Sequence, residues 1–247
     1  MKIIAVIPAR FGSTRFPGKP LAELKGKKIL QWVVEGARTS SLVSQIYVAT
    51  DDQRIYDFCR SIQVEVIMTS AQCLTGTDRI YEATKNLEFD CVLNIQGDEP
   101  LISKDFIDPL AQAFLADKDL EMATLAHPLQ SEDLLNPNAV KVITNCRQEA
   151  IYFSRLPIPF SREIKSNLQS KTVAETDVMK HVGLYGYSKS FLKQFCTTSP
   201  AAIEQRESLE QLRALYLGAK IKVLTVKKPT YGVDTIEDLQ KLEALLK

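Results

Sequence analysis

Residues 3–20 of the 247-residue chain read IIAVIPARFGSTRFPGKP, a short apolar run followed by a loop of glycines, hydroxyl residues and cations. Ile3–Ile7 is uninterrupted and apolar, as expected for a buried strand, and Pro8 stops it. In open α/β sheets, ligands bind beyond the carboxyl ends of the strands. The sequence therefore predicts a first strand at residues 3–7 and a ligand-binding loop directly after it.

This loop has the composition of a polyphosphate site. Its glycines allow close backbone approach, its hydroxyl residues donate hydrogen bonds, and its cations supply countercharge. The residues concerned are Gly12, Gly18, Ser13, Thr14, Arg10, Arg15 and Lys19. The loop is not a Walker A loop, because its glycines are too far apart and Pro20 stands where Ser or Thr would coordinate magnesium. A solvated basic loop is the alternative interpretation.

Strand-like and helix-like segments alternate through the first 120 residues. Further strands are predicted at Ile46–Ala49, Val64–Met68 and Cys91–Ile95. Apolar residues recur with helical spacing in the segments 30–37, 55–62 and 106–115. Alternation of this kind predicts an α/β fold with a mostly parallel sheet and helices on both faces.

The pattern changes between residues 121 and 187, where strands follow one another without full helices. These strands are predicted at Met122–Leu125, Val140–Ile143, Ala150–Phe153 and Val182–Tyr187. We expect a small antiparallel or dimerisation lobe there, with a polar loop at 162–176, inside a single domain spanning 1–247. A helix at 204–217, a strand at 221–226 and a last helix capped by Asp234 or Thr235 are predicted to return the chain to α/β.

Bulk composition narrows the function classes. The chain is 45% apolar and 25% charged, with a net charge of only +1, which argues against a nucleic-acid partner. Five widely spaced cysteines without a C-x-x-C pair favour a reducing compartment, and no signal peptide is visible. No apolar run approaches the ~20 residues of a membrane-spanning helix. We expect a cytoplasmic protein without membrane insertion.

Two acidic segments are candidates for binding a metal. Asp98 follows the apolar strand Val92–Ile95 in the sequence VLNIQGDEP, and magnesium on nucleotide phosphates takes only one or two protein carboxylates. Asp234, in YGVDTIED, could be a second ligand. An acidic turn before a helix and a helix cap are the alternative interpretations.

Two further side chains have open roles. His181 lies in a predicted strand, where a structural role is the more common one. Arg155 could hold a carboxylate through two parallel hydrogen bonds or be a surface cation.

Taken together, these segments resemble the 3-deoxy-D-manno-octulosonate (Kdo) cytidylyltransferases. The matching segments, in the family's order, are Pro8–Pro20, Ala49–Asp52, Thr75–Arg79, Asn94–Pro100, Asn136–Lys141, Tyr152–Arg155, His181–Tyr187, Leu209–Arg213 and Gly232–Asp238. This chain has Thr75 where the family usually has Ser, and Leu156 where a smaller residue is usual. The first change keeps the hydroxyl, and the second could reshape the wall of the sugar site.

The resemblance implies a Rossmann-like nucleotide-diphospho-sugar transferase fold, a homodimer, and a set of site residues. Implied to bind the nucleotide are Arg10, Ser13, Arg15, Lys19, Gly76, Arg79 and Gln96, with Arg10, Lys19, Asp98 and Asp234 catalytic. Implied to bind the sugar are Gln96, Arg155, His181, Tyr185, Glu210 and Gln211. Asp98 and Asp234 would hold Mg²⁺.

The implied reaction transfers CMP from CTP to the anomeric hydroxyl of Kdo, releasing pyrophosphate, in lipopolysaccharide biosynthesis. The 8-amino analogue of Kdo or another acidic sugar is an alternative acceptor. A sialic acid cytidylyltransferase or a sugar-1-phosphate nucleotidyltransferase would be an enzyme of neighbouring specificity. A non-catalytic nucleotide sensor is the alternative of a different class, and it predicts the loss of a metal carboxylate, whereas Asp98 and Asp234 are both present.

Overall fold

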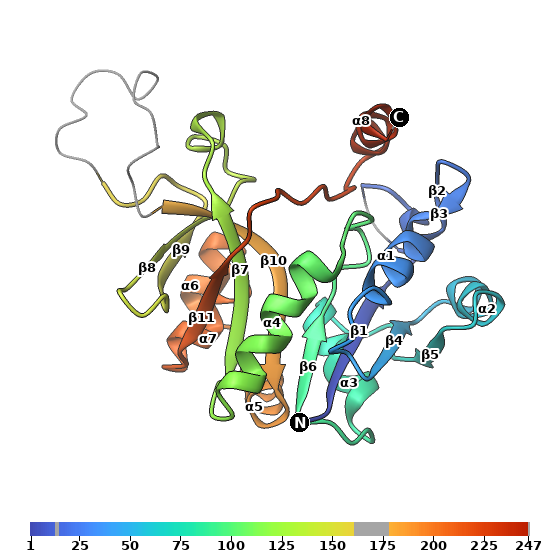
Figure 1. Ribbon diagram of the computed structural model, residues 1–247, viewed down its shortest axis with the longest axis horizontal. Helices are drawn as coiled ribbons and strands as arrows, with labels where there is room; N and C mark the ends of the chain where they lie inside the picture. Colours follow the sequence, from blue (N-terminus) through green and yellow to red (C-terminus); the bar gives the residue numbers. More distant parts are fainter. Residues whose placement is uncertain (13–14, 161–177, 247) are drawn as a thin grey trace.

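The fold is built on one mixed sheet (Figure 1). The computed structural model describes residues 1–12, 15–160 and 178–246. The main strands, in spatial order, are β11 (Ile221–Thr225), β7 (Met122–Pro128), β10 (Val178–Ser188), β6 (Cys91–Asn94), β1 (Ile3–Ala9), β4 (Gln45–Thr50) and β5 (Glu65–Met68). Strand β10 is antiparallel to both β6 and β7, and the other neighbouring strands are parallel. The predicted mixed, mostly parallel sheet is confirmed.

Helices cover both faces of this sheet. The helices on one face are α1 (Ile29–Ala37), α2 (Gln53–Ser61) and α4 (Lys104–Ala116). Those on the other face are α3 (Gly76–Thr84), α5 (Lys189–Thr197) and α7 (Leu212–Tyr216), which the short α6 (Ala202–Glu207) precedes.

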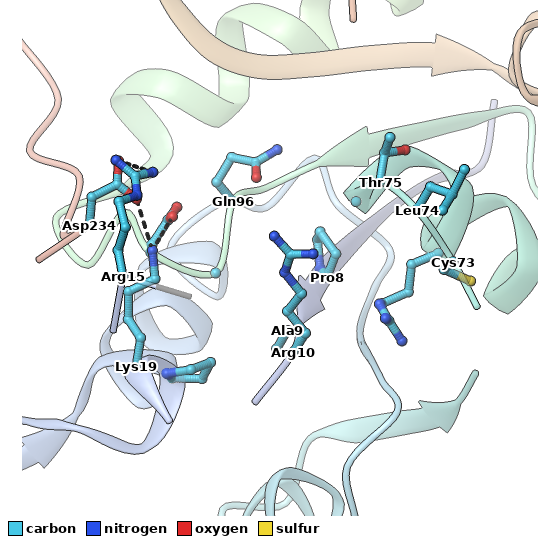
Figure 2. Close-up of a pocket in the computed structure, with 15 residues that line it drawn as sticks. Pro8, Ala9, Arg10, Arg15, Lys19, Cys73, Leu74, Thr75, Gln96 and Asp234 are labelled. Carbon is cyan, nitrogen blue, oxygen red and sulfur yellow. Dashed lines mark hydrogen bonds and ion pairs between the residues drawn. The ribbon is translucent and has the colours of Figure 1, made fainter. Parts of the chain in front are cut away.

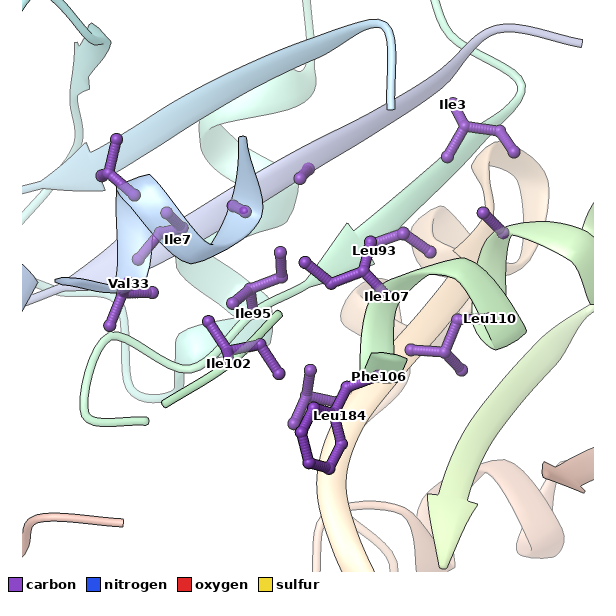
Figure 3. Packing of buried hydrophobic residues seen from close by; sticks show 14 of the residues in the cluster. Ile3, Ile7, Val33, Leu93, Ile95, Ile102, Phe106, Ile107, Leu110 and Leu184 are labelled. Atoms are coloured by element: carbon purple, nitrogen blue, oxygen red, sulfur yellow. The ribbon is translucent and has the colours of Figure 1, made fainter. Parts of the chain in front are cut away.

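The central strand explains why the first segment is apolar at every position. Ile3 and Ile7 of β1 pack into the core under α1 and α4 (Figure 3). Ile4 and Val6 pack into the core on the opposite face. A strand buried on both faces must be continuously hydrophobic rather than alternating. The register places the carboxyl ends of β1, β4 and β6 at one edge of the sheet.

Antiparallel strands extend one side of the molecule. The N-terminal part of β10, residues 178–180, pairs with β8 (Lys141–Thr144), which pairs with β9 (Ala150–Ser154). The antiparallel pairing predicted in this region is therefore present. The assignment of residues 121–187 to a lobe, and its use in dimerisation, remain predictions, and the loop predicted at 162–176 lies outside the described residues.

The prediction of one continuous helix over residues 204–217 was wrong. Helix α6 ends at Glu207, its C-cap Ser208 has a φ of 50° in the left-handed region, and α7 begins only at Leu212. No Gly or Pro marks this break, so the sequence carries no strong signal for it. Helices α3 and α5 were not predicted at all.

The last segment crosses back over the sheet to end at α8 (Ile236–Leu245), beside the hairpin of β2 (Glu23–Leu24) and β3 (Lys27–Lys28). A small core joins Leu24, Ile29, Val233 and Leu242 from these distant parts of the chain. Two 3₁₀ turns complete the elements, η1 (Lys19–Leu21) and η2 (Ser131–Asp133). Among the helices of the described ranges, none is both long and apolar enough to cross a bilayer.

Candidate active site

A polar pocket lies where the carboxyl ends of β1 and β6 meet the start of α3 (Figure 2). Its volume is about 270 Å³. The lining residues are Pro8, Ala9, Arg10, Arg15, Lys19, Pro20, Cys73, Leu74, Thr75, Gly76, Arg79, Gln96, Gly97, Asp98 and Asp234. The pocket therefore gathers every nucleotide-site and metal-site residue implied by the resemblance except Ser13, which lies outside the described residues.

The basic loop after β1 folds back on itself and fixes Lys19. The Gly18 N–H donates to the Phe11 carbonyl over 2.9 Å, and Gly18 has a φ of 73°, which favours glycine. A Cβ at this position would also lie 2.9 Å from the Phe11 ring. Turn η1 then begins at Lys19, whose side chain is only 11% exposed.

Two carboxylates converge on the ammonium of Lys19. Its Nζ lies 2.7 Å from Asp98 Oδ2 and 3.1 Å from Asp234 Oδ1, and Arg15 Nη2 lies 3.1 Å from the other oxygen of Asp234. Figure 2 shows Arg15 and Lys19 pointing toward Asp234 from the basic loop, with Arg10 projecting into the space between this group and the Cys73–Thr75 segment. Residues more than 200 positions apart thus form one charged cluster.

Backbone pairing and capping place Asp234. The Val233 N–H donates to the Asp98 carbonyl over 2.9 Å, so the two acidic segments are joined directly. Thr235, not Asp234, is the N-cap of α8, in a reciprocal capping box with Asp238. Of the two capping residues considered from the sequence, Thr235 is therefore correct, and the Asp234 carboxylate faces the pocket.

The neighbouring acid, Glu99, turns away from the pocket lining toward residues 230–232. A Cβ at Gly232 would lie 3.3 Å from Glu99 Oε1. Burial, with the adjacent charge of Asp98, raises the pKa of Glu99 to about 8, although hydrogen bonds from the Thr230 hydroxyl and the Tyr231 N–H act in the opposite direction. Of the two adjacent carboxylates, Asp98 is the one that lines the pocket.

Helix α3 presents its N-terminus to the pocket. Thr75 caps it in a capping box with Asp78, which leaves Gly76 at the pocket wall. Arg79 is buried, and its Nη2 lies 2.9 Å from Asp51 Oδ2 while Nη1 donates to Thr69 Oγ1 over 2.6 Å. The exposed amide groups at a helix N-terminus favour anions.

Four of the six residues predicted to bind the sugar form a second cluster, apart from the pocket lining: His181, Tyr185, Glu210 and Gln211. Tyr185 Oη donates to Gln211 Oε1 over 3.2 Å, and the rings of Tyr185 and His181 lie 5.4 Å apart. Burial raises the pKa of Glu210, and hydrogen bonds from the Thr77 and Thr75 hydroxyls partly counteract this increase. Since Thr75 also lines the pocket, Glu210 lies where the two groups of residues adjoin.

Two polar atoms of this second cluster have no hydrogen-bond partner within the part of the chain that the structure describes. They are Glu210 Oε1 and Gln211 Nε2, and the side chain of Gln211 belongs to a residue only 3% exposed. Buried polar atoms are nearly always satisfied, so both atoms can still form a hydrogen bond with a polar ligand or water.

Gln96 lies between the two groups. Its Nε2 donates to Asn94 Oδ1 over 3.0 Å, and Asn94 Nδ2 in turn donates to Thr77 Oγ1 over 3.4 Å. Asn94 is paired in register with Tyr185 of the second cluster. The position of Gln96 is compatible with contacts to both a nucleotide and a sugar.

His181 is held in its cluster by Thr124. Its Nε2 lies 3.0 Å from Thr124 Oγ1, whose hydroxyl also lies 2.7 Å from the Leu184 carbonyl. Because the hydroxyl has one proton and the carbonyl must accept it, Nε2–H of a neutral imidazole is the donor to Oγ1. Burial lowers the pKa of His181 to about 3.

Arg155 does not join the second cluster through its guanidinium. Its Nε, Nη1 and Nη2 donate to the carbonyls of Glu207, Pro137 and Ser208, respectively. All three nitrogens therefore hold backbone together in this structure. The sequence left a carboxylate-binding role and a surface-cation role open, and neither describes these contacts.

Sequence reasoning missed two residues of the pocket wall, Cys73 and Leu74, and gave no role to Gly97. Leu74 is 81% exposed although apolar, and Cys73 donates to Glu82 Oε2 over 3.1 Å. Gly97 lies so close to β1 that an added Cβ would be 2.8 Å from the Pro8 carbonyl oxygen. Gly97 was readable as part of the QGDEP segment, but nothing in the sequence distinguishes Cys73 or Leu74.

The donor set suits magnesium bound together with phosphate. No group of three or more His, Cys, Asp or Glu side chains able to hold a metal occurs within residues 1–12, 15–160 and 178–246. Asp98 and Asp234 instead offer two carboxylates aimed at one cation, the ammonium of Lys19. Two carboxylates completed by phosphate oxygens and water are the usual ligands of nucleotide-associated Mg²⁺.

Comparison with known proteins identifies the family of this chain. Residues 4–221 match the cytidylyltransferase family. The chain is 56% identical to the 3-deoxy-manno-octulosonate cytidylyltransferase of Bdellovibrio bacteriovorus, covering 100% of this chain and 98% of that protein. The protein of the same name from Trichlorobacter lovleyi is 45% identical, with 100% and 99% covered.

A solved structure matches over the same length. CMP:2-keto-3-deoxy-manno-octonic acid synthetase complexed with CTP superposes with a TM-score of 0.92 at 39% identity, covering 100% of this chain and 98% of that one. The match therefore extends over the length of both chains. The chain belongs to the cytidylyltransferase family, in its group of 3-deoxy-manno-octulosonate cytidylyltransferases.

Proposed function

We propose that this protein is a nucleotidyltransferase that moves CMP from CTP to the anomeric hydroxyl of Kdo, forming CMP-Kdo and releasing pyrophosphate. The observation that carries the proposal is the convergence of the basic loop and the two carboxylates at the carboxyl ends of the central strands. Relatives named for this activity and a similar structure described as complexed with CTP support it.

The basic loop would hold the triphosphate. Arg10 projects into the pocket, and Arg15 and Lys19 stand beside it on the same loop. The N-terminus of α3 at Gly76 adds backbone N–H groups. Together these groups would align the α-phosphorus for attack and neutralise the negative charge that develops on the departing pyrophosphate.

Asp98 and Asp234 would hold Mg²⁺ against the phosphates. When bound there, magnesium would neutralise phosphate charge and lower the pKa of the attacking hydroxyl. The backbone bond from Val233 to Asp98 and the Thr235 cap keep both carboxylates at the pocket wall before substrate arrives. Such preorganisation reduces the reorganisation needed during the reaction.

The second cluster would bind the sugar. Its unpartnered Glu210 Oε1 and Gln211 Nε2 can accept from and donate to sugar hydroxyls. Neutral His181 and the Tyr185 hydroxyl add further polar contacts without an unpaired charge. Arg155 would have to exchange a backbone carbonyl for the sugar to take part.

We further propose a homodimer in the cytoplasm, acting in lipopolysaccharide biosynthesis. Large apolar side chains are exposed around β8 and β9, with Leu135, Ile151 and Leu156 exposed by 52%, 56% and 69%. Exposed apolar surface, where it is contiguous, is typical of an interface between protein chains. We therefore propose that the second copy binds on the side of the molecule that carries β9.

The test measures pyrophosphate release with Mg²⁺ for each of the four common NTPs, combined with Kdo, 8-amino-Kdo or N-acetylneuraminate. Turnover that needs both CTP and Kdo is the expected result. Preference for the amino sugar or the sialic acid would overturn the acceptor, and CTP binding without turnover of any pair would support the sensor alternative.

A further inference from the structure

The cation site of the pocket is already filled by a side chain. Lys19 Nζ lies within 3.1 Å of both Asp98 and Asp234, and its side chain is only 11% exposed, against 31% and 46% for the two carboxylates. Magnesium binds carboxylate oxygens at about 2.0–2.1 Å. An ion that close to both oxygens would lie against the ammonium, so the two cations compete for the same ligands.

The charge of the pocket wall adds to this competition. Four cations line the pocket, Arg10, Arg15, Lys19 and Arg79, against two carboxylates. A divalent cation without nucleotide therefore enters a positively charged pocket, whereas a triphosphate is attracted to it. The nucleotide also offers the metal its missing oxygen ligands and offers the ammonium a new partner.

The loop allows Lys19 to change partners without moving its backbone. The backbone at Lys19 is fixed by the left-handed Gly18 and by Pro20 in turn η1. The ammonium, in contrast, is carried on a flexible four-carbon chain with three donors that can reorient. The Lys19 ammonium can therefore reorient while the backbone stays in place.

We propose that Lys19 is an internal counter-ion that keeps Asp98 and Asp234 from binding a divalent cation until a nucleoside triphosphate draws the ammonium onto its phosphates. The proposal rests on the proposed function, since it assigns an order of events to the same site. Metal affinity and nucleotide affinity are then coupled, and the coupling is reciprocal. The enzyme would take up its metal with the nucleotide rather than before it.

The experiment measures Mn²⁺ binding without nucleotide, by counting free Mn²⁺ with electron paramagnetic resonance. We compare the wild-type chain with Lys19→Met and Lys19→Gln, which remove the charge while keeping a side chain of similar length. Lys28→Met is the matched control, because Lys28 pairs with Glu23 over 2.8 Å outside the pocket. Thermal unfolding of each variant verifies that it is folded.

Mn²⁺ affinity should rise at least ~10-fold in both Lys19 variants, within the range typical of coupled sites. It should stay unchanged in Lys28→Met, and the gain should disappear when Asp98→Asn is added to Lys19→Met. Equal Mn²⁺ affinity in the wild type and in folded Lys19 variants would overturn the proposal.

The outcomes separate this proposal from the proposed function. If the Lys19 variants gain no Mn²⁺ affinity while the wild type converts CTP and Kdo, the counter-ion role fails and the reaction stands. If they gain affinity but the wild type converts no substrate pair, the counter-ion role stands and the reaction fails.

Discussion

The end of β1 and the segment after β6 approach each other closely at Gly97, and the variant Gly97→Ala tests the importance of this contact. The added Cβ would lie 2.8 Å from the Pro8 carbonyl oxygen, a backbone atom that cannot rotate away. Carbon–oxygen contacts are normally about 3.3–3.6 Å, so Gly97 and the end of β1 must separate by ~0.5–0.8 Å. This displacement acts between the start of the basic loop and Asp98.

The magnitude of the effect follows from that displacement. Overpacking of this kind costs ~1–3 kcal/mol in the free energy of unfolding. For a chain of this size, a Tm decrease of ~2–12 °C is expected. A misplacement approaching 1 Å can cost ~100-fold in rate, so we expect kcat/KM to fall ~10–100-fold, which is more than the loss of stability would cause at 25 °C.

The assay is pyrophosphate release at 25 °C with saturating Mg²⁺, together with calorimetric Tm values. Gly183→Ala is the control for packing, because nothing lies within 4 Å of a Cβ built there, and its Tm should match that of the wild type. A Gly97→Ala enzyme with wild-type kcat/KM would refute the claim that this close approach positions the site.

Three other predictions concern charge and pH. Arg213→Met should lower the free energy of unfolding by ~3–5 kcal/mol in urea titrations, because it leaves Glu204 buried without its ion-pair partner, and a loss below ~1 kcal/mol would contradict this. His181 is neutral in the folded state because burial lowers its pKa to about 3, whereas in the unfolded chain it gains a proton below its ordinary pKa of 6.5. The free energy of unfolding should therefore decrease as the pH is lowered from 6.5 to 3. The decrease should be less steep in His181→Phe, as urea titrations at several pH values can measure. Asp234→Asn should lower kcat/KM at least ~100-fold, because a bound metal contributes several kcal/mol to phosphate-transfer catalysis. It should also raise the Mg²⁺ concentration needed for half-maximal rate. An unchanged Mg²⁺ titration would argue against Asp234 as a ligand.

Much of the fold could be predicted because its signals are local. The apolar run Ile3–Ile7 is buried on both faces of the sheet, which is why every position in it is hydrophobic. The break at Ser208 was not predictable in the same way. Serine adopts the left-handed conformation there without any of the Gly, Pro or Asn residues that usually announce such a turn.

The pocket was predictable wherever several signals coincided. Arg10 directly follows β1, Lys19 lies in the loop after it, and Asp98 lies in the segment after β6. The carboxyl ends of parallel strands meet at one edge of a sheet. Asp234 could not be assigned from its segment alone, because capping and metal binding fit the same sequence. In the structure Thr235 is the N-cap of α8, so capping is not the role of the Asp234 side chain.

What the sequence could not supply was the pairing of charges. Nothing in the order of residues indicates that Lys19 lies between two carboxylates, or that Arg155 uses its guanidinium on three backbone carbonyls. Both depend on tertiary contacts between distant segments. Motif matching alone would assign Lys19 only to phosphate and Arg155 only to the sugar.

The central claim is that this pocket transfers CMP to Kdo through a site that depends on Asp98. The most direct measurement is phosphorus-31 NMR of CTP, Kdo and Mg²⁺ mixed with the wild-type protein or with Asp98→Asn. The account predicts a new CMP-sugar phosphodiester resonance and pyrophosphate in equal amounts, formed by the wild type and reduced at least ~100-fold in the variant. Formation of CDP and inorganic phosphate, or equal rates in both proteins, would contradict it.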